Sequence, residues 1–243
     1  MGKLNLFFVL LTFYCIYAEE IAENEGEAAL ENSNLFESDI LRSFDTDRNA
    51  VVAEKRKWPN ARIPYIIDSK LKKQESLIKE AMDHYANKTC IRFVPRKDEK
   101  QYVNILKGKG CYSHVGRTSG VQPLSLGPKC YKFGIIVHEL GHAVGFYHEH
   151  SRSDRDDYIN IHYENIQPGY EFQFVKMNPK QNQLLTEFDF DSIMMYGDTV
   201  FSKNRQEDLK TMTAKSGRTW KRVADKPGLS ESDVTRISKL YNC

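Results

Sequence analysis

The chain has 243 residues, 40% of them hydrophobic, and a formal net charge of +2. This composition suits one globular domain plus a further segment, and it excludes a fibrous or wholly disordered protein. The small net charge hides an asymmetry, because residues 19–48 carry a balance of −8 and residues 49–243 a balance of +9. We expect the acidic segment either to lie against the basic remainder or to form a solvated tail.

Residues 1–18 have the pattern of a secretory signal peptide. Lys3 supplies the positive start, an apolar stretch runs from Leu4 to Ile16, and Ala18 is a small residue suited to cleavage. The apolar stretch is too short to span a bilayer comfortably, which disfavours the alternative of an uncleaved membrane anchor. We therefore expect a secreted, extracellular protein without stable membrane insertion.

The region after the signal peptide divides into two parts. Residues 19–48 are acidic and are predicted to be a pro-segment, and residues 49–243 are predicted to contain a compact domain. Arg48 and the basic cluster at residues 55–57 both offer basic cleavage sites between the two parts. Charge alone does not choose between them.

The first half of the compact domain is predicted to mix helix and strand. An extended run at residues 63–67 precedes a helix capped by Ser69, and strands are expected at residues 91–94 and 102–106. The helix buries one face through apolar residues at a three-and-four spacing: Leu77, Ile78, Ala81, Met82 and Tyr85.

The second half begins with a predicted helix over residues 133–146, in which Gly145 stands near the end. Its apolar side carries Ile135, Ile136, Leu140 and Val144. The chain is then expected to be irregular up to about Leu229. Ser230, with acidic residues in the following turn, is predicted to cap a last short helix.

Four cysteines remain once the signal peptide is removed: Cys90, Cys111, Cys130 and Cys243. An even number in an oxidising compartment favours two disulfides, but spacing leaves all three pairings open. The absence of a C-x-x-C pair disfavours a thiolate zinc site. Asn87 begins an Asn-Lys-Thr sequon and is a predicted glycosylation site.

A H-E-x-x-H motif lies inside the second predicted helix and consists of His138, Glu139 and His142. Residues four apart lie on one helix face, so both imidazoles can reach one metal ion while Glu139 lies beside them. The motif alone leaves an alternative, in which two surface histidines flank a solvated glutamate.

The extension to H-E-x-x-H-x-x-G-x-x-H removes that alternative. Gly145 permits a sharp exit from the helix, which returns His148 to the metal. Five fixed letters arise by chance on the order of 10⁻⁶ to 10⁻⁷ per starting position. Three neutral nitrogen ligands suit one Zn²⁺ per molecule and leave a position open for water, as in catalytic sites. Glu139 is the predicted general base and later the acid for the leaving amine.

Residues 138–158, HELGHAVGFYHEHSRSDRDDY, resemble the long signature of the astacin family of metzincin proteases at every specified position. The resemblance implies an α+β catalytic domain with two lobes. In that family a mixed sheet and helices form the N-terminal lobe, the C-terminal lobe is largely irregular with a final helix, and zinc lies in the cleft between them. It implies a secreted zinc endopeptidase made as a latent zymogen.

A second segment, residues 192–197, is similar to the Met-turn of that family. The resemblance makes Met194 the floor beneath the metal and Tyr196 an additional zinc ligand, which can swing away to stabilise the oxyanion. Met195 stands where histidine is usual. Without the resemblance, this Met-Met-Tyr run would be interpreted as hydrophobic core.

The same resemblance extends over nearly the whole chain beyond the signal peptide. It implies disulfides between Cys90 and Cys243 and between Cys111 and Cys130. It also implies a maturation junction near Arg48, after which the new amino terminus folds inward to approach Glu149.

The propeptide contains a segment, Leu35 to Ile40, that is similar to the inhibitory F-x-G-D motif of the family. The resemblance makes Asp39 the group that occupies the zinc in place of water in the latent form. Ser38 stands where glycine is usual. Asp45 and Asp47 lie in a competing candidate segment, but its short distance from the junction leaves little chain to reach the cleft.

The leading hypothesis is an active endopeptidase that takes polypeptide substrates and is activated by a protease near Arg48. A zinc-binding pseudoprotease and a matrix-binding protein that uses its basic face are the alternatives. The presence of Glu139 favours the enzyme, because binding alone would need the histidines but not the base. No nucleic-acid partner is expected.

Overall fold

The structure is a computed structural model that describes residues 28–41, 54–180 and 182–243. The predicted signal peptide, the junction at Arg48 and the candidates Asp45 and Asp47 lie outside these residues. Within the described ranges, no helix is long and apolar enough to cross a membrane.

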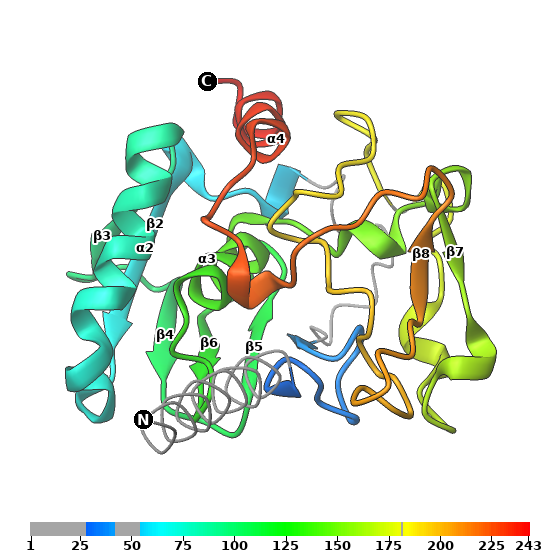
Figure 1. The fold of residues 1–243 in the computed structure, drawn as a ribbon. Coiled ribbons are helices and arrows are strands. Elements are labelled where there is room, and N and C mark those ends of the chain that lie inside the picture. The colour runs from blue at the N-terminus through cyan, green and yellow to red at the C-terminus, as the bar shows by residue number, and fades with distance from the viewer. Residues whose placement is uncertain (1–27, 42–53, 181) are drawn as a thin grey trace, which may run out of the picture.

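A six-stranded sheet forms the centre of the first half (Figure 1). Only the β5 and β6 pair is antiparallel, so the sheet is mixed as expected. Its outermost strand on one side, β1, lies in the predicted propeptide and pairs in parallel with β5, with Ile40 opposite Ser113. In spatial order, the strands are β1 (Ile40–Leu41), β5 (Cys111–His114), β6 (Val121–Leu126), β4 (Tyr102–Leu106), β2 (Arg62–Ile67) and β3 (Arg92–Pro95).

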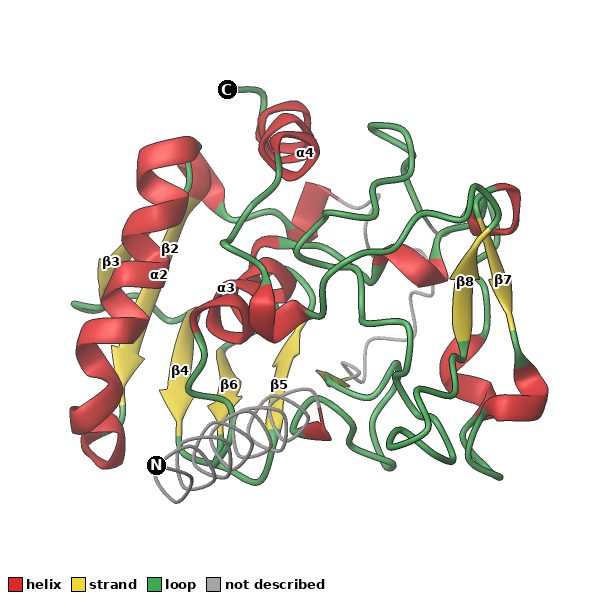
Figure 2. Ribbon diagram, viewed as in Figure 1, coloured by secondary structure: helices red, strands yellow, loops and turns green. Residues whose placement is uncertain are grey.

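Two helices, α2 (Glu75–Lys88) and α3 (Phe133–Val144), pack against the sheet and against each other (Figure 2). The α2 residues that are fully or nearly buried are Ile78, Ala81, Met82 and Tyr85, which confirms the predicted face. The predicted cap was wrong. Ser69 opens a 3₁₀ helix (Ser69–Gln74), whose cap is Asp68, and α2 starts after it.

Helix α3 is the core helix of the molecule. Every residue from Gly134 to Val144 is buried, because the sheet, α2 and the chain near Val223 surround it. Two residues far apart in the chain, Trp58 and Tyr241, both attach to its last turn. The indole of Trp58 donates to the Ala143 carbonyl at 2.8 Å, and the hydroxyl of Tyr241 donates to the Val144 carbonyl at 2.7 Å.

The chain after α3 has little regular structure, as predicted. It contains the antiparallel pair β7 (Ile159–Ile161) and β8 (Met212–Ala214), and α4 (Glu231–Tyr241) ends it (Figure 1). Ser230 caps α4 in a capping box with Asp233. The remaining short 3₁₀ turns are Glu54–Arg56, Pro59–Ala61, Glu149–Ser151, Arg155–Asp157, Tyr163–Asn165, Glu171–Phe174 and Val223–Asp225.

Two disulfides connect distant parts of this fold. Cys90 after α2 bonds to Cys243 at the end of the chain, and Cys111 in β5 bonds to Cys130 before α3. These are the pairs that the family resemblance implies.

Candidate active site

Helix α3 positions two histidines one turn apart, and its end positions a third. Gly145 has φ +136°, a conformation that favours glycine, and its N–H donates to the carbonyls of Gly141 and His142. The helix stops there, and the chain turns back. His138, His142 and His148 are therefore all fully buried and face one point.

The three imidazoles have the geometry of a zinc site. Nε2 of His138 lies 3.2 Å from Nε2 of His142 and 3.3 Å from Nε2 of His148. Tetrahedral zinc with Zn–N bonds of about 2.0–2.1 Å requires nitrogens about 3.3–3.4 Å apart. The residues present therefore fit one zinc ion.

Each of these histidines also has an oxygen acceptor for its other ring nitrogen. Nδ1 of His138 lies 2.8 Å from the Ile193 carbonyl, and Nδ1 of His142 lies 2.7 Å from the Phe146 carbonyl. Nδ1 of His148 lies 2.8 Å from Oε2 of Glu37. Because a proton on Nδ1 serves each acceptor, every Nε2 lone pair remains available for the metal.

Asp39, in the predicted propeptide, lies among these nitrogens. Its Oδ2 is 3.1 Å from Nε2 of His138, and its Oδ1 is 3.2 Å from Nε2 of both His142 and His148. Burial raises the pKa of Asp39, but His148 and His142 outweigh this and hold it well below its usual value. Asp39 thus lies where a fourth ligand of the metal belongs.

Glu139 follows His138 in the helix and is fully buried. Neither of its carboxylate oxygens has a hydrogen-bond partner among the described residues. Burial, and secondarily the negative charge of Asp39, raises its pKa well above the usual value. The carboxylate is therefore uncommitted and able to exchange a proton.

Tyr196 faces the same point from the Met-turn. Its ring lies 4.3 Å from that of His148, centroid to centroid, and its hydroxyl is 2.5 Å from Oδ2 of Asp39. Burial, and next the charge of Asp39, raises the pKa of Tyr196 well above its usual value, so the phenol remains a hydrogen-bond donor.

The Met-turn packs directly beneath helix α3. A Cβ on Gly141 would lie only 2.7 Å from Sδ of Met194, so the absence of a side chain at Gly141 permits this close approach. Met194 is buried and passes under the histidine-bearing turn. Met195, at the departure from the family pattern, is also buried, and its carbonyl accepts from Nζ of Lys226 at 2.6 Å.

Two charged residues hold the backbone of that turn. Asp233, at the start of α4, accepts from the Ser192 hydroxyl at 2.6 Å and from the Ile193 N–H at 2.8 Å. Lys226 donates to the Ser192 carbonyl at 2.6 Å. Neither of these contacts was predicted from the sequence, because each joins segments more than 30 residues apart.

Glu37 and Ser38 were also missed as contacting residues, although they directly precede Asp39. Ser38 Oγ lies 2.9 Å from the Tyr196 hydroxyl. Both residues have left-handed backbones, with φ +45° at Glu37 and +70° at Ser38. Such a conformation costs about 1–2 kcal/mol for each non-glycine residue. It turns three consecutive side chains, 37 to 39, toward the site.

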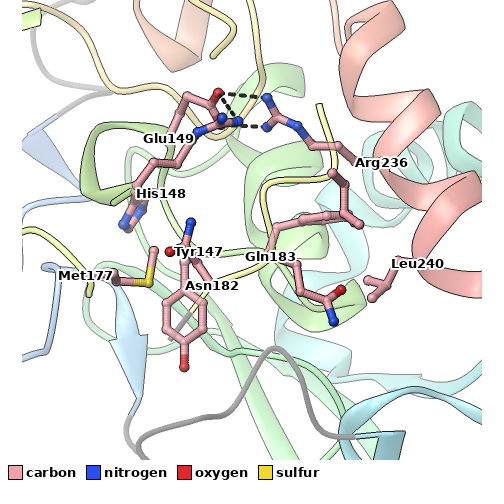
Figure 3. A pocket seen from close by; sticks show the side chains of 11 residues that line it. Tyr147, His148, Glu149, Met177, Asn182, Gln183, Arg236 and Leu240 are labelled. Atoms are coloured by element: carbon pink, nitrogen blue, oxygen red, sulfur yellow. Dashed lines mark hydrogen bonds and ion pairs between the residues drawn. The ribbon is translucent and has the colours of Figure 1, made fainter. Parts of the chain in front are cut away.

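Glu149 lines a pocket beside the metal site, together with residues that follow α3, with Met177, Asn182, Gln183 and Leu185, and with Arg236 and Leu240 of α4 (Figure 3). Arg236 binds it with two nitrogens at 2.5 and 2.7 Å, and Arg152 lies at 3.2 Å. Burial raises the pKa of Glu149, and these two arginines oppose the increase. Adjacent residues His148 and Glu149 thus connect the metal site to this pocket.

Asn87 is exposed on the last turn of α2, far along the chain from the zinc motif. The hydroxyl of Thr89, the third residue of its sequon, donates to the Tyr85 carbonyl at 2.7 Å. Glycosylation of Asn87 stays a prediction.

Comparisons with known proteins agree with this site. Residues 50–242 match the peptidase family described as Astacin. Astacin-like metalloprotease toxin 1 of Loxosceles intermedia is 43% identical over 248 residues, covering 99% of this chain and 92% of that protein. Tolloid-like protein 1 of Homo sapiens is 41% identical over 200 residues, covering 81% of this chain but only 20% of that much longer protein.

Among solved structures, High choriolytic enzyme 1, a hatching enzyme zinc-protease from Oryzias latipes, is similar with a TM-score of 0.70 and 37% identity. The match covers 84% of this chain and 100% of that one. The shared sequence, the shared fold and the convergent histidines show that the chain belongs to the astacin family of zinc metalloproteases.

Proposed function

We propose that this protein is a secreted endopeptidase that is made as a latent precursor and cleaves extracellular polypeptides. One observation carries the proposal: both carboxylate oxygens of Asp39, a propeptide residue, lie 3.1–3.2 Å from the three ligand nitrogens. Two disulfides support secretion, because such bonds form and persist in oxidising compartments.

His138, His142 and His148 would hold Zn²⁺, which when bound supplies the Lewis-acid chemistry that activates water and polarises the scissile carbonyl. Glu139 would act as the general base. Its two oxygens are uncommitted, and it projects from the same helix as two ligands. The proton that it takes would later pass to the leaving amine.

The hydroxyl of Tyr196 would donate a hydrogen bond to the oxyanion of the tetrahedral intermediate. The Trp220 indole donates to the Tyr196 carbonyl at 2.7 Å, and the Tyr196 ring packs beside His148, so the phenol is held next to the metal position. A preorganised donor in a buried site stabilises developing charge better than water does.

Latency would follow from competition for these groups. In the precursor, Asp39 takes the position of the water and accepts from the Tyr196 hydroxyl. Cleavage near Arg48 would release the propeptide, so that the water position and the Tyr196 hydroxyl would both become free. The new amino terminus would then enter the pocket in Figure 3 and approach Glu149. A cation there would have to share the carboxylate with Arg236 and Arg152.

The test compares the zinc-loaded precursor with the protein after limited cleavage, using casein and a peptide library. We expect the precursor to be nearly inactive and the cleaved protein to hydrolyse both substrates. Chelation should abolish hydrolysis and added zinc should restore it. A cleaved, zinc-loaded protein that hydrolysed neither substrate would instead be a zinc-binding pseudoprotease.

Glu149→Gln tests the activation step separately. It should lower hydrolysis by the cleaved protein without reducing the zinc content of the precursor. Equal activity of the cleaved variant and wild type would remove Glu149 from the mechanism.

A further inference from the structure

The three zinc-ligand histidines differ in where their second ring nitrogen finds its acceptor. His138 and His142 use the carbonyls of Ile193 and Phe146, which belong to the catalytic domain and stay in place after activation. His148 uses Glu37, a side chain of the propeptide. The third ligand is therefore oriented by a group that leaves when the propeptide is removed.

The contact between Glu37 and His148 has the features of a built interaction. The two side chains are 2% and 0% exposed, and Oε2 lies 2.8 Å from Nδ1. The other oxygen, Oε1, is buried and has no hydrogen-bond partner among the described residues. Burying Oε1 without a hydrogen bond is unfavourable. The hydrogen bond between Oε2 and His148 is the favourable interaction that offsets this cost.

The neighbouring chain fixes Glu37 from both sides. The Leu35 carbonyl accepts from the Gln173 side chain at 3.2 Å, and the Asp39 carbonyl accepts from the Ser113 N–H at 2.9 Å. Between these anchors the backbone adopts the left-handed conformation at Glu37. An unfavourable backbone held by its surroundings is typical of a functional position.

We infer that Glu37 supports the metal centre of the precursor without binding the metal itself. It accepts the hydrogen bond from Nδ1 of His148 and thereby slows zinc release. This inference rests on the proposed latent precursor. A carboxylate on the outer nitrogen fixes the orientation of a ligating imidazole and strengthens its bond to the metal. Loss of such a partner typically lowers metal affinity by about 10–100-fold. The propeptide would thus retain the metal until cleavage as well as block the site.

The test measures the rate at which the intact, zinc-loaded precursor loses zinc to a coloured chelator. Glu37→Ala should release zinc roughly 10–100-fold faster than wild type, and Glu37→Gln should fall between them because its neutral amide still accepts a hydrogen bond. Thermal unfolding and far-ultraviolet circular dichroism check that each variant is folded.

Glu31→Ala is the matched control. Glu31 is a largely buried carboxylate of the same segment, and it binds the Phe201 N–H at 3.0 Å and Arg205 instead of a histidine. The Glu31→Ala substitution weakens the attachment of the propeptide but removes no contact to the metal-ligand histidines. We expect zinc release from this variant within about twofold of wild type.

Asp39 needs a separate control because it lies two residues from Glu37 and at the metal position. The comparison is therefore repeated in an Asp39→Ala background, where Glu37→Gln must still accelerate release. Equal rates with and without Glu37 in that background, or equal effects of Glu31→Ala and Glu37→Ala, would overturn the inference. Zinc release requires no peptide hydrolysis, so its result is independent of whether the cleaved protein proves to be a protease.

Discussion

The hydroxyl of Tyr196 and Oδ2 of Asp39 lie 2.5 Å apart, although 157 residues separate them in the chain. The same carboxylate lies against all three ligand histidines. One side chain of the predicted propeptide therefore covers the metal position and also engages the proposed oxyanion donor. The proposed activation has to break both contacts, so the two groups would become available together.

Glu139→Gln should keep one zinc per molecule but reduce peptide hydrolysis by roughly 10²–10⁴-fold, because ligation survives while proton transfer does not. Metal analysis and initial rates on a quenched peptide measure the two effects. His142→Ala is the control and should lose zinc and activity together. Near wild-type hydrolysis by Glu139→Gln would refute the assignment of the base.

Tyr196→Phe in the cleaved enzyme should lower kcat by roughly 10²–10³-fold with little change in KM, since the phenol acts on the transition state. The ring and its packing against His148 are kept. Steady-state kinetics give both constants. An unchanged kcat would return Tyr196 to a packing role.

Asp39→Ala should give a precursor with measurable activity before any cut near Arg48. Release should be partial, because Glu31 still binds Arg205 and Ala29 still pairs with Cys111. Added salt should raise the activity further by screening the acidic propeptide from the basic domain. Rates on a small peptide at increasing salt measure both effects.

Asp45→Ala and Asp47→Ala are the controls for that experiment, and both should stay latent. A latent Asp39→Ala precursor together with an active Asp45→Ala or Asp47→Ala precursor would move the inhibitory role to the later segment.

Asp233→Asn should destabilise the fold by about 1–3 kcal/mol, because the Ser192 hydroxyl and the Ile193 N–H bind different oxygens of the carboxylate, and an amide keeps only one acceptor oxygen. Urea unfolding measures the change. Glu231→Gln, at an exposed position of the same helix turn, is the control and should stay within about 0.5 kcal/mol of wild type. Equal effects of the two variants would mean that the Met-turn does not depend on Asp233.

Alkaline pH should weaken the attachment of α4 through Tyr241. Burial raises the pKa of Tyr241 to about 12, against about 10 in an unfolded chain. The folded state therefore holds this proton more tightly. Its contribution is fully present below pH 10 and is lost as the pH rises to 12.

Unfolding in urea at a series of pH values measures this loss. Between pH 9 and 12, the stability of wild type relative to Tyr241→Phe should fall by up to about 2–3 kcal/mol. Tyr241→Phe has no phenol at this position. It is the reference for wild type, because every other titrating group is the same in the two proteins. A pH-independent difference would contradict the predicted shift.

Local spacing was sufficient to predict the metal ligands. His138 and His142 share a helix face whatever surrounds the helix, and Gly145 lets the chain return His148 within a few residues. The buried face of α2 and the cap of α4 were predicted for the same reason, since each depends on neighbours within one or two turns. The prediction that Ser69 caps the helix failed for a local reason as well, because the neighbouring Asp68 takes the capping position.

Only the tertiary structure decided what surrounds those ligands. Strands β5 and β6 were missed because their short, mixed patterns become strands only when paired with each other and with β4. Glu37 meets His148 across 111 residues, and Asp233 meets Ser192 across 41. Side-chain spacing along the chain carries no information about such contacts, because their geometry depends on how the whole backbone closes around helix α3.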